Sequence, residues 1–123
     1  MPAKQDVTRF IRSTFRSVWA LELLCFLRRH GDRAWVEADL VSGLRASDLI
    51  VSQSLTALTA AGLVTVESDG AARYRPASPD LDTLAAAAES LYTRSPDAVR
   101  RLIVSSAVSD LTAFADAFKF RRD

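Results

Sequence analysis

The segment 51–75, VSQSLTALTAAGLVTVESDGAARYR, constrains the fold of this 123-residue chain more than any other stretch. Its first half carries apolar residues at helical spacing, and Gly62 ends that helix before the β-branched run LVTVE. Asp69 and Gly70 form a strong hairpin signal, and ARYR returns as the partner strand before Pro76. The segment therefore predicts a helix that leads directly into a two-stranded hairpin.

Helical patterns surround this segment on both sides. Residues 7–30 read as one helix, and its second half, 18–27, is apolar at nine of ten positions and should be buried on nearly all sides. A second helix is expected over about Val36 to Leu44, and a third runs from the N-cap Ser47 to about Ala61. After the hairpin, Ser78 as N-cap and Pro79 as first residue begin a helix that should reach about Tyr92. Ser95 and Pro96 should begin a further helix in the same way. A last helix is expected from the apolar stripe Leu111, Phe114 and Phe118.

The predicted architecture is mainly α with a small β-hairpin wing, as a single domain over residues 1–123. Three helices followed at once by a hairpin are the winged helix-turn-helix arrangement, here at 34–76. The segments 1–33 and 77–123 supply extra N- and C-terminal helices. The apolar run at 18–27 and the small-residue stretch LAAAAESLY favour pairing with a second copy, so a homodimer is expected.

Several classes of protein are disfavoured by what the chain lacks. The single Cys25 excludes an intrachain disulfide and favours a reducing, cytoplasmic setting. The apolar run 18–27 contains Glu22 and is too short to span a bilayer, so no membrane association is expected. One histidine, His30, and one cysteine are too few for a zinc site, and no glycine-rich phosphate loop is present. We therefore expect no metal, no cofactor and no enzymatic activity.

The stretch 51–78, VSQSLTALTAAGLVTVESDGAARYRPAS, resembles the winged helix-turn-helix transcriptional regulators of the MarR and ArsR type. In that family a leucine-spaced recognition helix ends in an aaGLV step into the wing, and the matching positions here are Val51, Leu55, Leu58, Gly62, Leu63 and Val64. The resemblance covers roughly residues 34–76. It implies a DNA-binding regulator whose third helix enters the major groove of double-stranded DNA while the wing contacts the backbone.

Carried onto this sequence, the resemblance implies a set of DNA contacts. On the third helix Gln53 would read an adenine edge, and Ser52 or Thr56 would bond a base or a phosphate. Two arginines two residues apart on the second strand would reach phosphate from one wing face, Arg73 and Arg75. The start of the third helix would hold another phosphate through Arg45 and the amides behind Ser47. Apart from the resemblance, spacings of three and four place three arginines on one face of the first helix, either as further backbone contacts or as a solvated face: Arg9, Arg12 and Arg16.

The charge distribution opposes this interpretation. Residues 34–90 carry three arginines against eight acidic residues, whereas both ends of the chain have an excess of cations. The third helix has no lysine or arginine, begins with Asp48, and leads to the acidic wing tip ESDGA. The alternative is therefore a winged-helix protein-interaction module, an adaptor or antagonist on the transcription machinery. Leu49 and Ile50 are expected to complete the core, and exposure of either would mark a protein contact or a thymine methyl contact.

Overall fold

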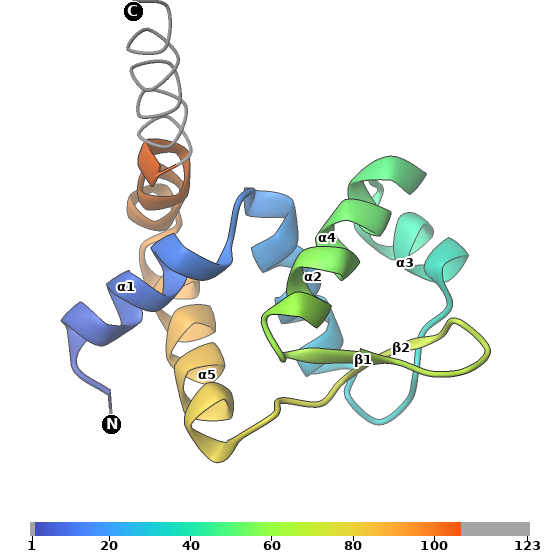
Figure 1. Cartoon of the computed structure of the whole chain (residues 1–123). Coiled ribbons are helices and arrows are strands. Elements are labelled where there is room, and N and C mark those ends of the chain that lie inside the picture. Colours follow the sequence, from blue (N-terminus) through green and yellow to red (C-terminus); the bar gives the residue numbers. More distant parts are fainter. Residues whose placement is uncertain (1, 107–123) are drawn as a thin grey trace, which may run out of the picture.

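The structure, a computed structural model, describes residues 2–106 (Figure 1). This part of the chain is mainly helical with one small antiparallel sheet. Its elements are α1 (Lys4–Thr14), α2 (Val18–Arg29), α3 (Glu37–Leu44), α4 (Asp48–Ala60), β1 (Val64–Val66), β2 (Ala72–Tyr74) and α5 (Pro79–Arg94). Residues 96–106 are also helical. The predicted stripe Leu111, Phe114 and Phe118 lies outside the described residues.

Helix α2 is the centre of the fold. It packs against α3, α4, α5 and β2, as Figure 1 shows. A helix with neighbours on so many sides must be apolar around most of its circumference. Its fully buried side chains are Leu21, Leu23, Leu24, Cys25 and Leu27. The predicted burial of 18–27 is therefore confirmed only in part, because Trp19 is 38% exposed.

The prediction of one continuous helix over residues 7–30 is wrong, because the chain breaks between α1 and α2. Phe15 has an extended backbone, with φ −102° and ψ 114°, and its ring is buried edge-on against Phe10 at 5.8 Å. The Ser17 side chain then accepts a hydrogen bond from the Ala20 amide at 3.3 Å and starts α2 as its N-cap. Both helices bury an apolar face, so the sequence pattern continues across the break.

The hairpin follows α4 as predicted and is held by a third segment. Val64 pairs with Tyr74, and Val66 pairs with Ala72. On the other edge of β2, Ala72 exchanges two backbone hydrogen bonds of 2.7 Å with Trp35, which lies between α2 and α3. Val64 is buried but Val66 is 48% exposed, so the inward face of β1 ends after one residue.

The last described helices pack around α1. Ser78 caps α5 by accepting from the Leu81 amide at 3.2 Å, as predicted, and α5 extends to Arg94. Helix α1 packs against α5, and the Ser106 hydroxyl donates to the Arg12 carbonyl at 3.2 Å. Within residues 2–106 no helix is both long and apolar enough to cross a membrane.

Candidate nucleic-acid interface

A tight turn joins α3 to α4. Arg45 takes a left-handed backbone, with φ 55° and ψ 40°, and the Ala46 amide donates to the Val41 carbonyl at 3.2 Å. The Ser47 side chain accepts from the Ile50 amide at 3.2 Å and begins α4, which confirms the predicted N-cap. The Arg45 side chain is exposed beside this turn. The Ser47 hydroxyl oxygen uses one lone pair for this cap, and its hydrogen is left to donate to a group outside the helix, such as a phosphate.

Helix α4 has one buried and one exposed face. It buries Val51, Ser54, Leu55 and Leu58 against the core. The predicted contact residues Ser52, Gln53 and Thr56 are all exposed. The Thr56 hydroxyl donates to the Ser52 carbonyl at 3.0 Å, so Thr56 turns its methyl group and its oxygen lone pairs to solvent.

The prediction that Leu49 and Ile50 are both buried is wrong. Leu49 is 65% exposed, the largest value among the exposed large hydrophobic residues of the described chain, and Ile50 is half-buried. The buried stripe of α4 begins only at Val51, which faces the core. Leu49 lies two positions earlier on the helix, which turns its side chain away from α2 and α3. An exposed leucine therefore stands in the first turn of α4.

A shallow groove lies between the exposed face of α4 and the hairpin. Its lining among the described residues is Glu37, Ser52, Leu55, Thr56, Thr59, Ala60, Val66 and Gly70. This lining contains one carboxylate, no lysine and no arginine. The groove is thus formed by hydroxyl and apolar groups, and positive charge has to come from its margins.

The two hairpin arginines differ in how free their charges are. Arg73 Nε lies 3.4 Å from Glu67 Oε1, and the Arg73 side chain is 37% exposed. Arg75 follows the end of β2, where its amide donates to the Leu63 carbonyl at 3.0 Å and its side chain is exposed. Glu67 thus offsets the Arg73 charge, whereas Arg75 has no ion pair among the described residues.

Tyr74, between the two arginines, faces the protein. Its hydroxyl donates to Asp82 of α5 at 2.6 Å, and the Arg28 guanidinium lies 5.4 Å from the centre of its ring. Burial, together with the hydrogen bond to Asp82, raises the pKa of Tyr74 to about 12. Tyr74 therefore fixes the base of the hairpin against α2 and α5.

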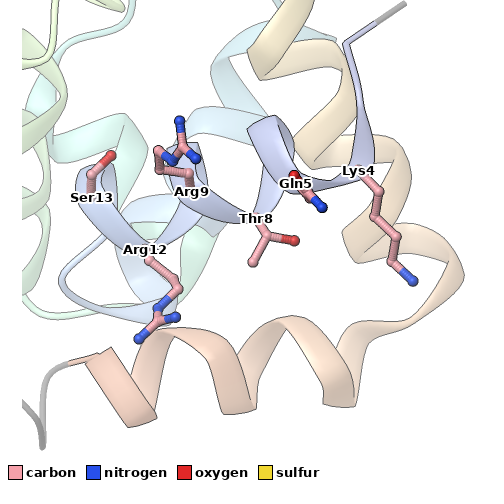
Figure 2. Close-up of a pocket in the computed structure, with 6 residues that line it drawn as sticks. All are labelled: Lys4, Gln5, Thr8, Arg9, Arg12 and Ser13. Carbon is pink, nitrogen blue, oxygen red and sulfur yellow. The ribbon is translucent and has the colours of Figure 1, made fainter.

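The predicted arginine stripe of the first helix is only partly formed. Arg9 and Arg12 are exposed on α1, but Arg16 lies in the link after the helix, so the three do not share a helical face. An open cavity beside α1 is lined by Lys4, Gln5, Thr8, Arg9, Arg12 and Ser13 (Figure 2). In Figure 1, α1 lies across the molecule from α3 and the hairpin turn. A duplex bound by α4 would need to extend well beyond that helix to reach the cations of α1.

A polar link between α2 and α5 was not predicted from the sequence. Arg28 of α2 donates to Glu89 of α5, and Arg29 Nε lies 3.6 Å from the same carboxylate. Near the other end of α2, Tyr92 donates to Glu22. The sequence feature that could have indicated these contacts is a single glutamate within each of two otherwise largely apolar stretches, VWALELLCFL and LAAAAESLY.

The remaining residues considered for chemistry have structural roles. Cys25 is buried as expected, and burial raises the pKa of its thiol to about 12. His30 caps α2, and its ring contacts Phe26 and Trp35 at centroid distances of 4.6 Å and 5.5 Å. Among residues 2–106 no group of three or more His, Cys, Asp or Glu side chains is placed to hold a metal ion.

No model of a known protein family matches the chain, and no curated protein matches its sequence significantly.

Proposed function

We propose that this chain is a DNA-binding transcriptional regulator that uses a winged helix-turn-helix, acting as a homodimer in the cytoplasm. In this proposal α3, α4 and the hairpin form the helix-turn-helix and wing. Helix α4 enters the major groove through Ser52, Gln53 and Thr56, while Arg45 and Arg75 contact phosphates. The MarR and ArsR type of regulator, which residues 34–76 resemble, is the corresponding class.

One observation carries the proposal: the exposed face of α4 and the hairpin border a single groove. A reading helix and a wing act together only if both can meet one duplex. The Trp35–Ala72 bridge and the contacts of Tyr74 hold the hairpin in this position, so it is braced from both sides. Such bracing favours a preformed surface over a loop that orders on binding.

The alternative function, a protein-interaction module acting as adaptor or antagonist on the transcription machinery, is favoured by the surface chemistry. Helix α4 has no cation, Leu49 is 65% exposed, and Glu37 lines the groove. Phosphate neutralisation supplies most non-specific DNA affinity, so this surface alone would bind DNA weakly. Under this alternative the exposed Leu49, beside a groove whose lining has no lysine or arginine, would contact a protein partner.

Fluorescence anisotropy with labelled duplexes at rising salt separates the two functions. A DNA-binding regulator is expected to bind random and promoter-proximal duplexes at low salt and to weaken steeply as salt increases. Arg75→Gln should flatten the slope of log affinity against log salt by about 0.9, the value for one lost phosphate contact. No binding to any duplex at about 50 mM salt would favour the protein-interaction module.

A matched control comes from the helical segment 96–106, which lies away from the hairpin turn in Figure 1. Arg101 is exposed in the helical segment 96–106 and makes no ion pair with the described residues. Arg101→Gln removes the same charge, so it should leave the salt slope near the wild-type value. Equal flattening by both substitutions would show that net charge, and not the wing, accounts for the effect.

A further inference from the structure

We infer that the DNA half-site read by α4 is rich in A·T base pairs and that Leu49 recognises the methyl group of a thymine. This inference rests on the proposed DNA-binding function and names the class of sequence that the same surface selects. It follows from which hydrogen-bonding and apolar groups α4 exposes, and from the unexpected exposure of Leu49.

The exposed face of α4 lacks the side chains that read guanine. The major-groove edge of guanine presents two acceptors, which arginine or lysine binds best. Helix α4 contains neither residue, and neither Arg45, which precedes α4, nor Arg75, which follows β2, lines the groove. Gln53 is exposed on α4, and its amide matches the adjacent acceptor and donor of adenine. The groups present thus favour adenine over guanine.

Apolar groups on the same face match thymine. The N-terminal residues of a recognition helix contact base edges, and Leu49 occupies the first turn of α4 with 65% of its surface exposed. Thr56 presents a methyl group because its hydroxyl hydrogen is bonded to the Ser52 carbonyl. In the major groove the thymine methyl is the apolar group that these side chains can cover.

The Ser52 hydroxyl can bond either kind of base pair and so does not discriminate, whereas two carboxylates would match a G·C pair through the cytosine amino group. They are Asp48, in the first turn of α4, and Glu37, in the groove. Neither forms an ion pair with a described residue. A carboxylate that gains one hydrogen bond from cytosine would sit between two phosphate backbones without a cation beside it. Charge repulsion offsets that bond, so A·T pairs remain the better match.

The test begins with selection of duplexes from a random library by the full chain, followed by anisotropy on the enriched sequence. The enriched half-site should be A·T-rich and should bind at least about tenfold more tightly than a G·C-rich duplex, since each well-read base pair contributes about 1–3 kcal/mol. Deoxyuridine then replaces thymine at one position after another, which removes only the methyl group. At the contacted thymine this should weaken wild-type binding about fourfold, the effect of about one buried methyl.

Leu49→Ala should remove this sensitivity, so that the thymine and deoxyuridine duplexes bind the variant equally. Val104→Ala is the control, since Val104 is 57% exposed in the helical segment 96–106, and it should keep the fourfold difference. Equal wild-type affinity for both duplexes at every position would overturn the role of Leu49, and a G·C-rich enriched site would overturn the A·T preference. Either result leaves the proposed DNA binding in place. Failure to bind any duplex at low salt would instead remove the proposed function, and this inference with it.

Discussion

Removal of the Glu89 carboxylate tests whether charge ties α5 to α2. Glu89 accepts a hydrogen bond from Arg28, and the side chains of Arg28 and Glu89 are only 18% and 20% exposed. The Arg28 guanidinium also lies over the Tyr74 ring at the base of the hairpin. Glu89→Ala would therefore leave a largely enclosed guanidinium without its nearest counter-charge.

The expected size of the effect follows from this partial burial. Exposed ion pairs contribute about 0–1 kcal/mol, whereas removing one partner of a fully buried pair costs about 3–5 kcal/mol. Hydrogen bonds to charged groups contribute about 1.5–3 kcal/mol. Because the side chains of Arg28 and Glu89 are about one-fifth exposed, their interaction should lie between those of an exposed and a fully buried ion pair. We expect a coupling free energy of about 2 kcal/mol between Arg28 and Glu89. In a chain of this length Glu89→Ala should lower the Tm by about 8 °C.

The assay is urea unfolding followed by circular dichroism on wild type, Glu89→Ala, Arg28→Met and the double variant. Methionine keeps an unbranched side chain against Tyr74 and removes the charge. A control cycle uses Asp97 and Arg100, which lie 3.2 Å apart with side chains 82% and 51% exposed, and should give below about 0.5 kcal/mol. A coupling between Arg28 and Glu89 no larger than that of the control pair would refute the reasoning.

Three further predictions concern stability and reactivity. Gly62→Ala and Gly70→Ala should each lower the free energy of unfolding in urea by about 1 kcal/mol, because φ is +78° and +86° there. The two losses should be equal, since an added Cβ meets nothing closer than 3.4 Å at either position. Burial and the hydrogen bond to Asp82 raise the pKa of Tyr74 from 10.0 to about 12, so stability should be lost as pH rises across that window. Tyr74→Phe should reduce the fall in Tm between those pH values. Cys25, whose thiol pKa burial raises from 9.0 to about 12, should react with a chromogenic disulfide only in urea, as absorbance would report.

The elements around the candidate interface were predictable because their signals are local. The Ser47 cap, the Gly62 stop and the Asp69-Gly70 turn each act over a few residues, and each is found where the sequence placed it. Ser78 begins α5 by the same kind of side-chain cap. Local chemistry of this type fixes where helices and hairpins begin and end, whatever packs against them.

The features that were mispredicted depend on contacts between distant elements. The break at Phe15 exists because its ring packs into the core, yet apolar spacing runs through 7–30 without interruption. The exposure of Leu49 depends on where α2 and α3 meet α4, which periodicity within α4 does not report. Likewise, the pairing of Arg73 with Glu67 follows from the register of the hairpin, which the sequence does not show. The sequence therefore predicted two equivalent hairpin arginines, whereas in the structure Arg73 is paired with Glu67 and Arg75 has no ion pair among the described residues. Charge and exposure at the candidate site were thus the least predictable properties.

The ion pair on the hairpin determines how much positive charge a wing could offer to DNA. Arg73 and Glu67 are 37% and 45% exposed, so their attraction is screened by water and contributes at most about 1 kcal/mol to stability. Glu67→Gln should therefore change the free energy of unfolding by less than about 1 kcal/mol while freeing Arg73 for phosphate. If the wing meets the backbone, DNA affinity should rise and the salt slope should steepen by about 0.9. Asp97→Asn changes net charge equally in the helical segment 96–106 and should have little effect on either. A Glu67→Gln chain that binds DNA with the parental affinity and slope would mean that this hairpin does not reach the phosphate backbone.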